Sequence, residues 1–303
     1  MASEHEHRHH DHAAHLPSRL TRTFLWCIGL NLLYAVLEFA IGLSTGSMGL
    51  VADAGHNMSD VISLILALGA VRLSMRAATK NYTYGFKKST ILASLLNAAI
   101  LLIAVGVIIT ESITKFIHPA AVEGGAIAWT AGAGVLINAF TAWLLLREQR
   151  GDLNVKGAYL HMVADTLVSV GVVFSGILIA HTGWYVVDPI VGLVVAAVIV
   201  SATWHLLTGS LRLTLDGVPE GIDPDRVNEL IRSTEGVSGV HHLHIWAIST
   251  TTNALTVHVV LEDLSRSNAV RRQLKEQLKA CGIAHATIET ESPDGLCDEQ
   301  ADD

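Results

Sequence analysis

The sequence predicts an α-helical membrane protein with six transmembrane helices, followed by a cytoplasmic α+β domain of ferredoxin-like element order αββαβ. Half of the 303 residues are hydrophobic and only 16% are charged, with a mean hydropathy of +0.44. Six apolar stretches reach the length of about 20 residues that a membrane span needs. After them the chain becomes polar, and two runs alternate like strands. We therefore expect a tail (1–18), a transmembrane domain (19–209), a linker (210–224) and a cytoplasmic domain (225–303).

The tail holds six of the sixteen histidines, among small or charged residues. Such a segment cannot form a hydrophobic core and is expected to be disordered. Its composition favours loose capture of metal ions. An expression tag is the alternative, and the interspersed Glu, Arg and Asp residues argue against it.

Positive charge is distributed unevenly among the connections of the six predicted spans, which are Leu20–Gly42, Met48–Val71, Ser89–Ile113, Ala126–Leu146, Gly157–Ala180 and Val186–Leu207. The first and last connections carry no Lys or Arg, and the middle one carries only Lys115. The other two carry eight: Arg72, Arg76, Lys80, Lys87, Lys88, Arg147, Arg150 and Lys156. Positive loops stay in the cytoplasm, so we expect both termini there. The short loops and the lack of organellar sorting signals favour a bacterial cytoplasmic membrane.

The polar C-terminal part begins with a linker marked by the breakers Gly217, Pro219, Gly221 and Pro224. The elements expected after it are a helix (Asp225–Ser233), two strands (Val240–Ala247, Ala254–Leu261), a helix (Asn268–Ala280) and a strand (His285–Glu291). From Arg212 onward there are 16 acidic and 8 basic residues. This balance argues against nucleic-acid binding and suits a domain that meets cations. The three cysteines show no disulfide or zinc-ribbon spacing.

The pattern His-x-x-x-Asp occurs in two predicted spans, as His56 with Asp60 and as His161 with Asp165. Residues four apart share one helix face, so each span presents an imidazole beside a carboxylate. Two such faces turned towards each other would supply two nitrogens and two oxygens, which suits tetrahedral Zn²⁺. Ionisable groups are costly in a bilayer and mark functional sites. The alternative is that the four groups bond one another as helix-packing contacts.

Other polar residues lie within the spans. Asp53 shares the face of His56 and Asp60, where it would orient an imidazole or lie near the outer mouth. Glu38 would line a water-filled path or relay protons. For the remaining amides, we expect hydrogen bonds between helices; these are Asn31, Asn97 and Asn138.

A second metal site in the cytoplasmic domain is suggested by histidines on its strands, with surface histidines as the alternative. His241, His242 and His244 lie on the first strand and His258 on the second. Strand alternation places His242 and His244 on one face and His241 on the other. Glu289 and Glu291 share a face of the last strand.

The chain after its tail resembles the cation diffusion facilitator family, in particular its zinc-exporting branch. The residues that carry the resemblance are Gly49–His56 (GLVADAGH) with Asp60, Leu153–Val155 (LNV) with His161 and Asp165, Leu215–Pro219 (LDGVP), His241–Trp246 (HHLHIW), and His285–Glu289 (HATIE) with Glu291.

The resemblance implies a homodimeric antiporter that exports divalent metal ions from the cytoplasm in exchange for protons. It implies a transport site of His56, Asp60, His161 and Asp165 between the second and fifth helices. It also implies a zinc-binding cytoplasmic domain that holds the dimer together, with His241, His258 and Glu291 as ligands. Two departures from the family matter. Arg76–Phe86, between the second and third spans, has neither His nor Asp, so no metal site is expected there. Many family members end in a cysteine-rich tail that helps bind metal, whereas the end of this chain has only Cys297, so no ligand role is expected for it.

The expected function is Zn²⁺/H⁺ antiport, by alternating access around a tetrahedral site. Two imidazoles favour Zn²⁺, Co²⁺ or Ni²⁺ over Mg²⁺ or Ca²⁺, and Cd²⁺ is a further candidate. Zinc is expected as substrate and as a structural or regulatory ligand of the cytoplasmic domain, with no cofactor. An enzyme is not expected, because no His-Glu-x-x-His motif occurs. A membrane metal sensor without transport and a passive channel remain as alternatives.

Overall fold

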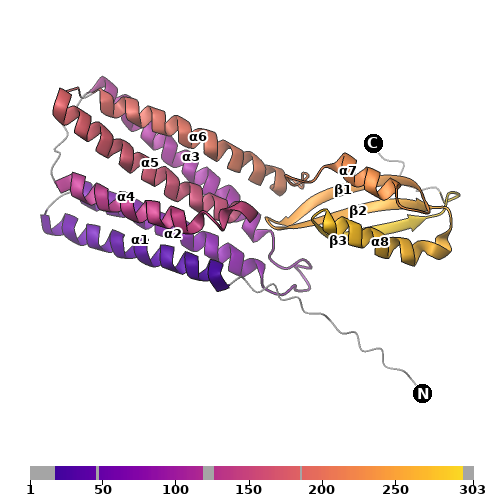
Figure 1. Cartoon of the computed structure of the whole chain (residues 1–303). Coiled ribbons are helices and arrows are strands. Elements are labelled where there is room, and N and C mark those ends of the chain that lie inside the picture. Colours follow the sequence, from indigo (N-terminus) through magenta and orange to yellow (C-terminus); the bar gives the residue numbers. More distant parts are fainter. Residues whose placement is uncertain (1–17, 46–47, 119–125, 185, 296–303) are drawn as a thin grey trace, which may run out of the picture.

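The computed structural model describes residues 18–45, 48–118, 126–184 and 186–295 (Figure 1). Its first part consists of long helices: α1 (Ser18–Thr45), α2 (Met48–Ser74), α3 (Ser89–Ile117), α4 (Ala126–Leu145), α5 (Leu153–Thr182) and α6 (Val187–Thr214). Each corresponds to one predicted span. Residues 1–17 of the predicted tail and Cys297 lie outside the described residues, and Ser18 already belongs to α1.

Three of these helices are apolar enough over their described length to cross a membrane, namely in Leu20–Ile41, Ser89–Ile117 and Pro189–Thr214. Helix α4 has a shorter apolar stretch, Gly132–Leu145. In α2, α4 and α5 the described residues form shorter stretches. That α2, α4 and α5 also cross the membrane therefore remains a prediction.

Helix α5 lies at the centre of the bundle, between α1, α2 and α4 on one side and α3 and α6 on the other (Figure 1). Two separate apolar cores meet on it. Met162 belongs to the first, together with residues of α1, α2 and α4 such as Phe24 and Leu64. Ala164 belongs to the second, together with Leu101 of α3 and residues of α6. Burial on both sides fixes the rotation of α5, and therefore the direction of its polar residues.

The C-terminal part has the predicted order αββαβ: α7 (Pro224–Arg232), β1 (Val237–Ser249), β2 (Thr252–Leu261), α8 (Ser267–Ala280) and β3 (Ile283–Glu291). The sheet order is β1-β2-β3, with β1 and β2 antiparallel and β2 and β3 parallel. Helix α8 makes the crossover that a parallel pair requires. Helix α7 starts cleanly because Asp223 accepts hydrogen bonds from the backbone at its first turn and Pro224 occupies the first helical position.

The two helices of this domain share one apolar core with the sheet. On β2, the alternate residues Leu255, Val257 and Val259 are buried in it, together with residues of α7 and α8. Strand alternation therefore turns His258 to the opposite face of the sheet. That face is where the histidine cluster lies.

Helix α6 continues to Thr214, into the segment expected as linker (210–224). The reason is packing, since Ser210 is fully buried and its hydroxyl lies 2.7 Å from the Ser94 hydroxyl of α3. The backbone leaves the helix at Asp216, where φ is +57°, next to the first predicted breaker.

The end of the β1–β2 hairpin rests on those ends of the bundle helices that face the C-terminal part (Figure 1). The Thr250 N–H donates to the Thr90 hydroxyl of α3 over 3.1 Å, and the Thr250 hydroxyl donates to Asp152 Oδ1 over 2.8 Å. An apolar cluster of Ile91, Leu213 and Ala247, with Leu153 packed on it, fills the junction. Polar and apolar contacts thus join the two domains at the starts of α3 and α5.

Candidate metal centres

Asp60, His161 and Asp165 meet inside the helical bundle. One ligand atom from each lies within 4.8 Å of the other two. His161 Nε2 is 2.7 Å from Asp60 Oδ1 and 3.8 Å from Asp165 Oδ2. All three residues are buried, with Asp60 fully so. The predicted juxtaposition of the two motifs is therefore present for these three residues.

His56, the fourth predicted ligand, belongs to α2 one turn before Asp60. Its side chain lies outside the described part of the structure, as does that of Asp53. The helical backbone places His56 on the same face of α2 as Asp60, so its role as a ligand stays a prediction.

A buried amide holds α5 against α2 near this site. Asn154 donates to the Ala67 carbonyl over 2.8 Å. Ala67 follows Asp60 by seven residues, and Asn154 precedes His161 by seven. Because the helices are antiparallel, the two contacts lie about two turns apart along the same seam. Asn154 thereby sets the register that brings His161 opposite Asp60.

A buried carboxylate lies beside the site. Glu38 of α1 is 1% exposed and accepts hydrogen bonds from Tyr34 Oη over 3.0 Å and from Asn57 Nδ2 over 2.7 Å. The amide of Asn57 was not singled out in the sequence, although it stands inside the first His-x-x-x-Asp motif. It ties α2 to α1 within one turn of Asp60. Of the predicted interhelical amides, Asn31 bonds the Thr141 hydroxyl of α4.

The second cluster lies on the helix-free face of the three-stranded sheet. His241, His258 and Glu291 each offer a ligand atom within 4.8 Å of the others. Glu291 Oε1 is 2.7 Å from His258 Nδ1, and Glu291 Oε2 is 3.3 Å from His241 Nε2. This pair of atoms is buried and makes no hydrogen bond within the described part of the chain. Buried polar atoms normally have a hydrogen-bond partner. Two buried atoms that lack one and face each other fit a shared metal ion, which both would bind.

The expected alternation of the first strand is wrong at His242. The β1–β2 register shifts between His241 and His244, where β1 holds one more residue than β2 and forms a bulge. As a result, the His242 ring lies near those of both His241 and His258. A bulge leaves no periodic trace in the sequence, so alternation could not reveal it.

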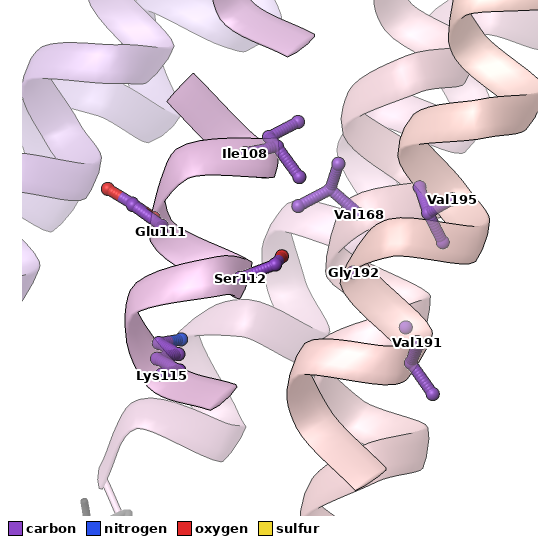
Figure 2. A pocket seen from close by; sticks show the side chains of 9 residues that line it. Ile108, Glu111, Ser112, Lys115, Val168, Val191, Gly192 and Val195 are labelled. Atoms are coloured by element: carbon purple, nitrogen blue, oxygen red, sulfur yellow. The ribbon is translucent and has the colours of Figure 1, made fainter. Parts of the chain in front are cut away.

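A separate pocket lies between α3, α5 and α6 (Figure 2). Ser112 of α3 points towards Gly192 of α6, and Val168, Val191 and Val195 close its apolar side. None of the metal-site residues lines this pocket. It marks a close crossing of helices rather than part of the metal site.

Comparison with known proteins agrees with this arrangement. The family model for the cation efflux transmembrane domain matches residues 25–213, and the model for the cytoplasmic domain of cation efflux proteins matches residues 219–293. Among curated relatives, the "Cadmium, cobalt and zinc/H(+)-K(+) antiporter" of Bacillus subtilis is 36% identical over 264 residues, covering 86% of this chain and 85% of the relative.

Two further relatives cover more of the chain. The "Zinc transporter ZitB" of Escherichia coli is 34% identical over 289 residues, which are 94% of this chain and 92% of the relative. The "Cation efflux system protein CzcD" of an Alcaligenes species is 34% identical over 284 residues, or 93% and 89%. With both halves matched by family models, the chain belongs to the cation diffusion facilitator family, in its zinc-exporting branch.

Proposed function

We propose that this protein exports Zn²⁺ from the cytoplasm in exchange for protons, by alternating access around a site of His56, Asp60, His161 and Asp165. The convergence of Asp60, His161 and Asp165 within 4.8 Å carries this proposal. Imidazole and carboxylate ligands suit Zn²⁺, and they accept Cd²⁺, Co²⁺ and Ni²⁺ as well. The relatives named for zinc, cadmium and cobalt support this substrate class.

The exchange with protons follows from the ligand chemistry. Zinc binds only to deprotonated ligands, so metal and protons compete for the same atoms. The 2.7 Å contact between His161 Nε2 and Asp60 Oδ1 holds a proton between two ligand atoms. A zinc ion that binds both atoms must release that proton. When the site opens to the other side of the membrane, the returning proton restores the contact and displaces the metal.

The polar cluster around Glu38 supports the site from the side. Glu38 accepts hydrogen bonds from both α1 and α2, so it fixes the face of α2 that carries Asp60. A site supported in this way keeps its ligands in place while the helices around it move. Alternation of access then requires only a change in which end of the bundle is open.

The cytoplasmic domain has a separate role in the proposal. We infer that a metal ion held by His241, His258 and Glu291 tightens a homodimer, because an ion that binds only the associated form stabilises that form. The protein would work as a multi-pass dimer in a bacterial cytoplasmic membrane, with both termini in the cytoplasm.

Zinc flux into proteoliposomes under an imposed pH gradient tests the transport proposal. We expect proton-driven flux in the native protein, and flux at the level of protein-free vesicles in Asp60→Asn and Asp165→Ala. Glu111→Gln is the matched control, since Glu111 is an exposed carboxylate on α3 outside the site. This control should retain native flux.

The other outcomes decide between functions. Zinc flux that ignores the pH gradient would overturn proton exchange and indicate a passive channel. Flux driven by a potassium gradient alone would assign the counter-ion to K⁺, which the name of the Bacillus relative includes. Bound zinc with no flux under any gradient would favour the membrane sensor. Native flux in Asp60→Asn would move the site elsewhere.

A further inference from the structure

Three imidazole rings on the cytoplasmic sheet form a nearly equilateral triangle. The ring centroids of His241 and His242 are 5.1 Å apart, those of His242 and His258 are 5.1 Å apart, and those of His241 and His258 are 5.3 Å apart. Nothing in the sequence alternation predicts this, because His242 would face away from both partners on a regular strand.

The backbone reaches this arrangement through an unusual conformation. His242 has φ of +49°, and Asp216 is the only other described non-glycine residue with positive φ. His242 sits at the bulge that shifts the β1–β2 register. Left-handed backbone is uncommon for residues other than glycine, and such conformations concentrate at functional sites. The left-handed backbone at His242 thus places its ring at the third corner of the triangle.

The size of the triangle matches a tetrahedral metal site. With Zn–N bonds of about 2.0 Å, two imidazoles on one tetrahedral ion hold their ring centroids about 5 Å apart. All three measured separations agree with this value. Rings that merely pack together adopt a wider range, with centroids about 4.5 to 7 Å apart.

Glu291 completes the set. Its two oxygens lie against His258 Nδ1 and His241 Nε2 at 2.7 and 3.3 Å. The other nitrogen of His258, Nε2, is 3.6 Å from Glu289 Oε2. A carboxylate at the far nitrogen of a ligand histidine is the usual outer partner that fixes the ring. This leaves Nδ1 of His258 for the ion.

We propose that His242 is a metal ligand, and that the cytoplasmic site is a closed four-ligand set of His241, His242, His258 and Glu291 for Zn²⁺ or a similar late first-row ion. The inference rests on the proposed metal role of the cytoplasmic cluster and adds a ligand to it. Four protein ligands leave no open position, so the ion is structural rather than transported. The set also needs no ligand from Cys297 or the histidine-rich tail.

The test uses the full-length protein with its transport site silenced by Asp60→Asn and Asp165→Asn, so that the transport site binds no metal and the histidine-rich tail contributes equally to every variant. Zn²⁺ affinity is obtained by chelator competition, and Co²⁺ absorption reports the coordination number. His242→Asn removes the imidazole, while asparagine readily keeps the left-handed backbone. His244→Asn is the matched control, because His244 is exposed on the same strand and pairs with Thr256 instead.

We expect His242→Asn to weaken Zn²⁺ binding about tenfold or more, and to abolish the intense absorption of four-coordinate Co²⁺. His244→Asn and Cys297→Ser should match the parent. Native affinity and an unchanged Co²⁺ spectrum in His242→Asn would overturn the proposal. A lower unfolding temperature of the metal-free protein without loss of affinity would also overturn it, because the ring would then only pack.

His258→Ala separates this inference from the site on which it rests. If His258→Ala loses the metal and His242→Asn does not, His242 is no ligand although the cluster binds metal. If His258→Ala keeps the metal, both the cluster and the inference fail. Neither result touches the transport site, which the flux measurement tests independently.

Discussion

Asp152 is a single residue that serves two domains. It precedes α5 with extended backbone, and its Oδ1 accepts the N–H of Asn154 over 2.8 Å, as a helix N-cap does. The same oxygen accepts the Thr250 hydroxyl from the cytoplasmic hairpin. Burial raises the pKa of the Asp152 carboxyl, while these hydrogen bonds act in the opposite direction. The acid therefore holds its proton more tightly in the folded protein than in the unfolded chain.

This pKa shift predicts a pH dependence of stability. Between the ordinary and the raised pKa of Asp152, the folded state binds more protons than the unfolded state, so stability falls as pH rises through that window. Asp152→Asn keeps the acceptor oxygen without the charge, and should remove this contribution and unfold at a higher temperature at neutral pH. Asp152→Ala loses the cap and should cost about 1 kcal/mol. Thermal unfolding in detergent at several pH values measures both, and an Asn variant less stable than the native protein would contradict the prediction.

For single residues, the sequence predicts which side chains share a helix face, but not where the backbone of a strand is strained. The spacing of His161 and Asp165 follows from helix geometry, and their approach to Asp60 is present as predicted. The proximity of His242 to His258 depends on a bulge, which is set by how β1 pairs with β2 rather than by the residues of β1 alone. The role of Asn57 could not be predicted, because its hydrogen bond to Glu38 depends on how α1 packs against α2.

Among the elements, the crossing of α3 and α6 depends on a missing side chain. A Cβ on Gly192 would collide with Ser112 Oγ, whereas Ser112 Cβ would remain at 3.5 Å, an ordinary contact. Figure 2 shows the Ser112 hydroxyl directed at this position. Small residues allow helices to approach closely in membranes, and here the approach supports the apolar core that α3 and α6 share with α5.

We predict that Gly192→Ala destabilises the protein by about 1–3 kcal/mol, as overpacking does. Removing the hydroxyl should rescue it, so that Ser112→Ala with Gly192→Ala is more stable than Gly192→Ala alone. Unfolding temperatures of the four proteins in this cycle test the contact. Purely additive effects would show that the two residues do not meet, since neighbours couple and distant sites do not.

The helices and strands themselves are predicted well from the sequence, because length, apolarity and periodicity are local properties. Their ends are less certain. Helix α5 begins at Leu153, four residues before the expected Gly157, because the Asp152 cap and buried Asn154 extend it. Helix α6 likewise runs beyond its expected end through the buried Ser210. Tertiary contacts decide both boundaries.

At the scale of the whole molecule, the two candidate metal sites are connected through β1 and β2. His241 and His258 pair across these strands, and the hairpin end at Thr250 lies about 25 Å further along, given the rise of a strand. Thr250 contacts Thr90 at the start of α3 and Asp152 at the start of α5. Helix α5 carries His161 and Asp165. The sequence predicts both domains but not this junction, since the partners of Thr250 lie 98 and 160 residues away in the chain.

We predict that Thr250 transmits the state of the cytoplasmic site to the transport site. Thr250→Val keeps the shape of the side chain and the Thr250 N–H bond to Thr90, and removes only the hydroxyl that binds Asp152. The effects of His258→Ala and Thr250→Val on the zinc transport rate should then be non-additive, with a coupling of about 0.5–2 kcal/mol. Thr251→Val, at the exposed neighbouring position, should show no coupling. Strictly additive effects of Thr250→Val and His258→Ala would mean that the hairpin end holds the domains together without passing information between the two sites.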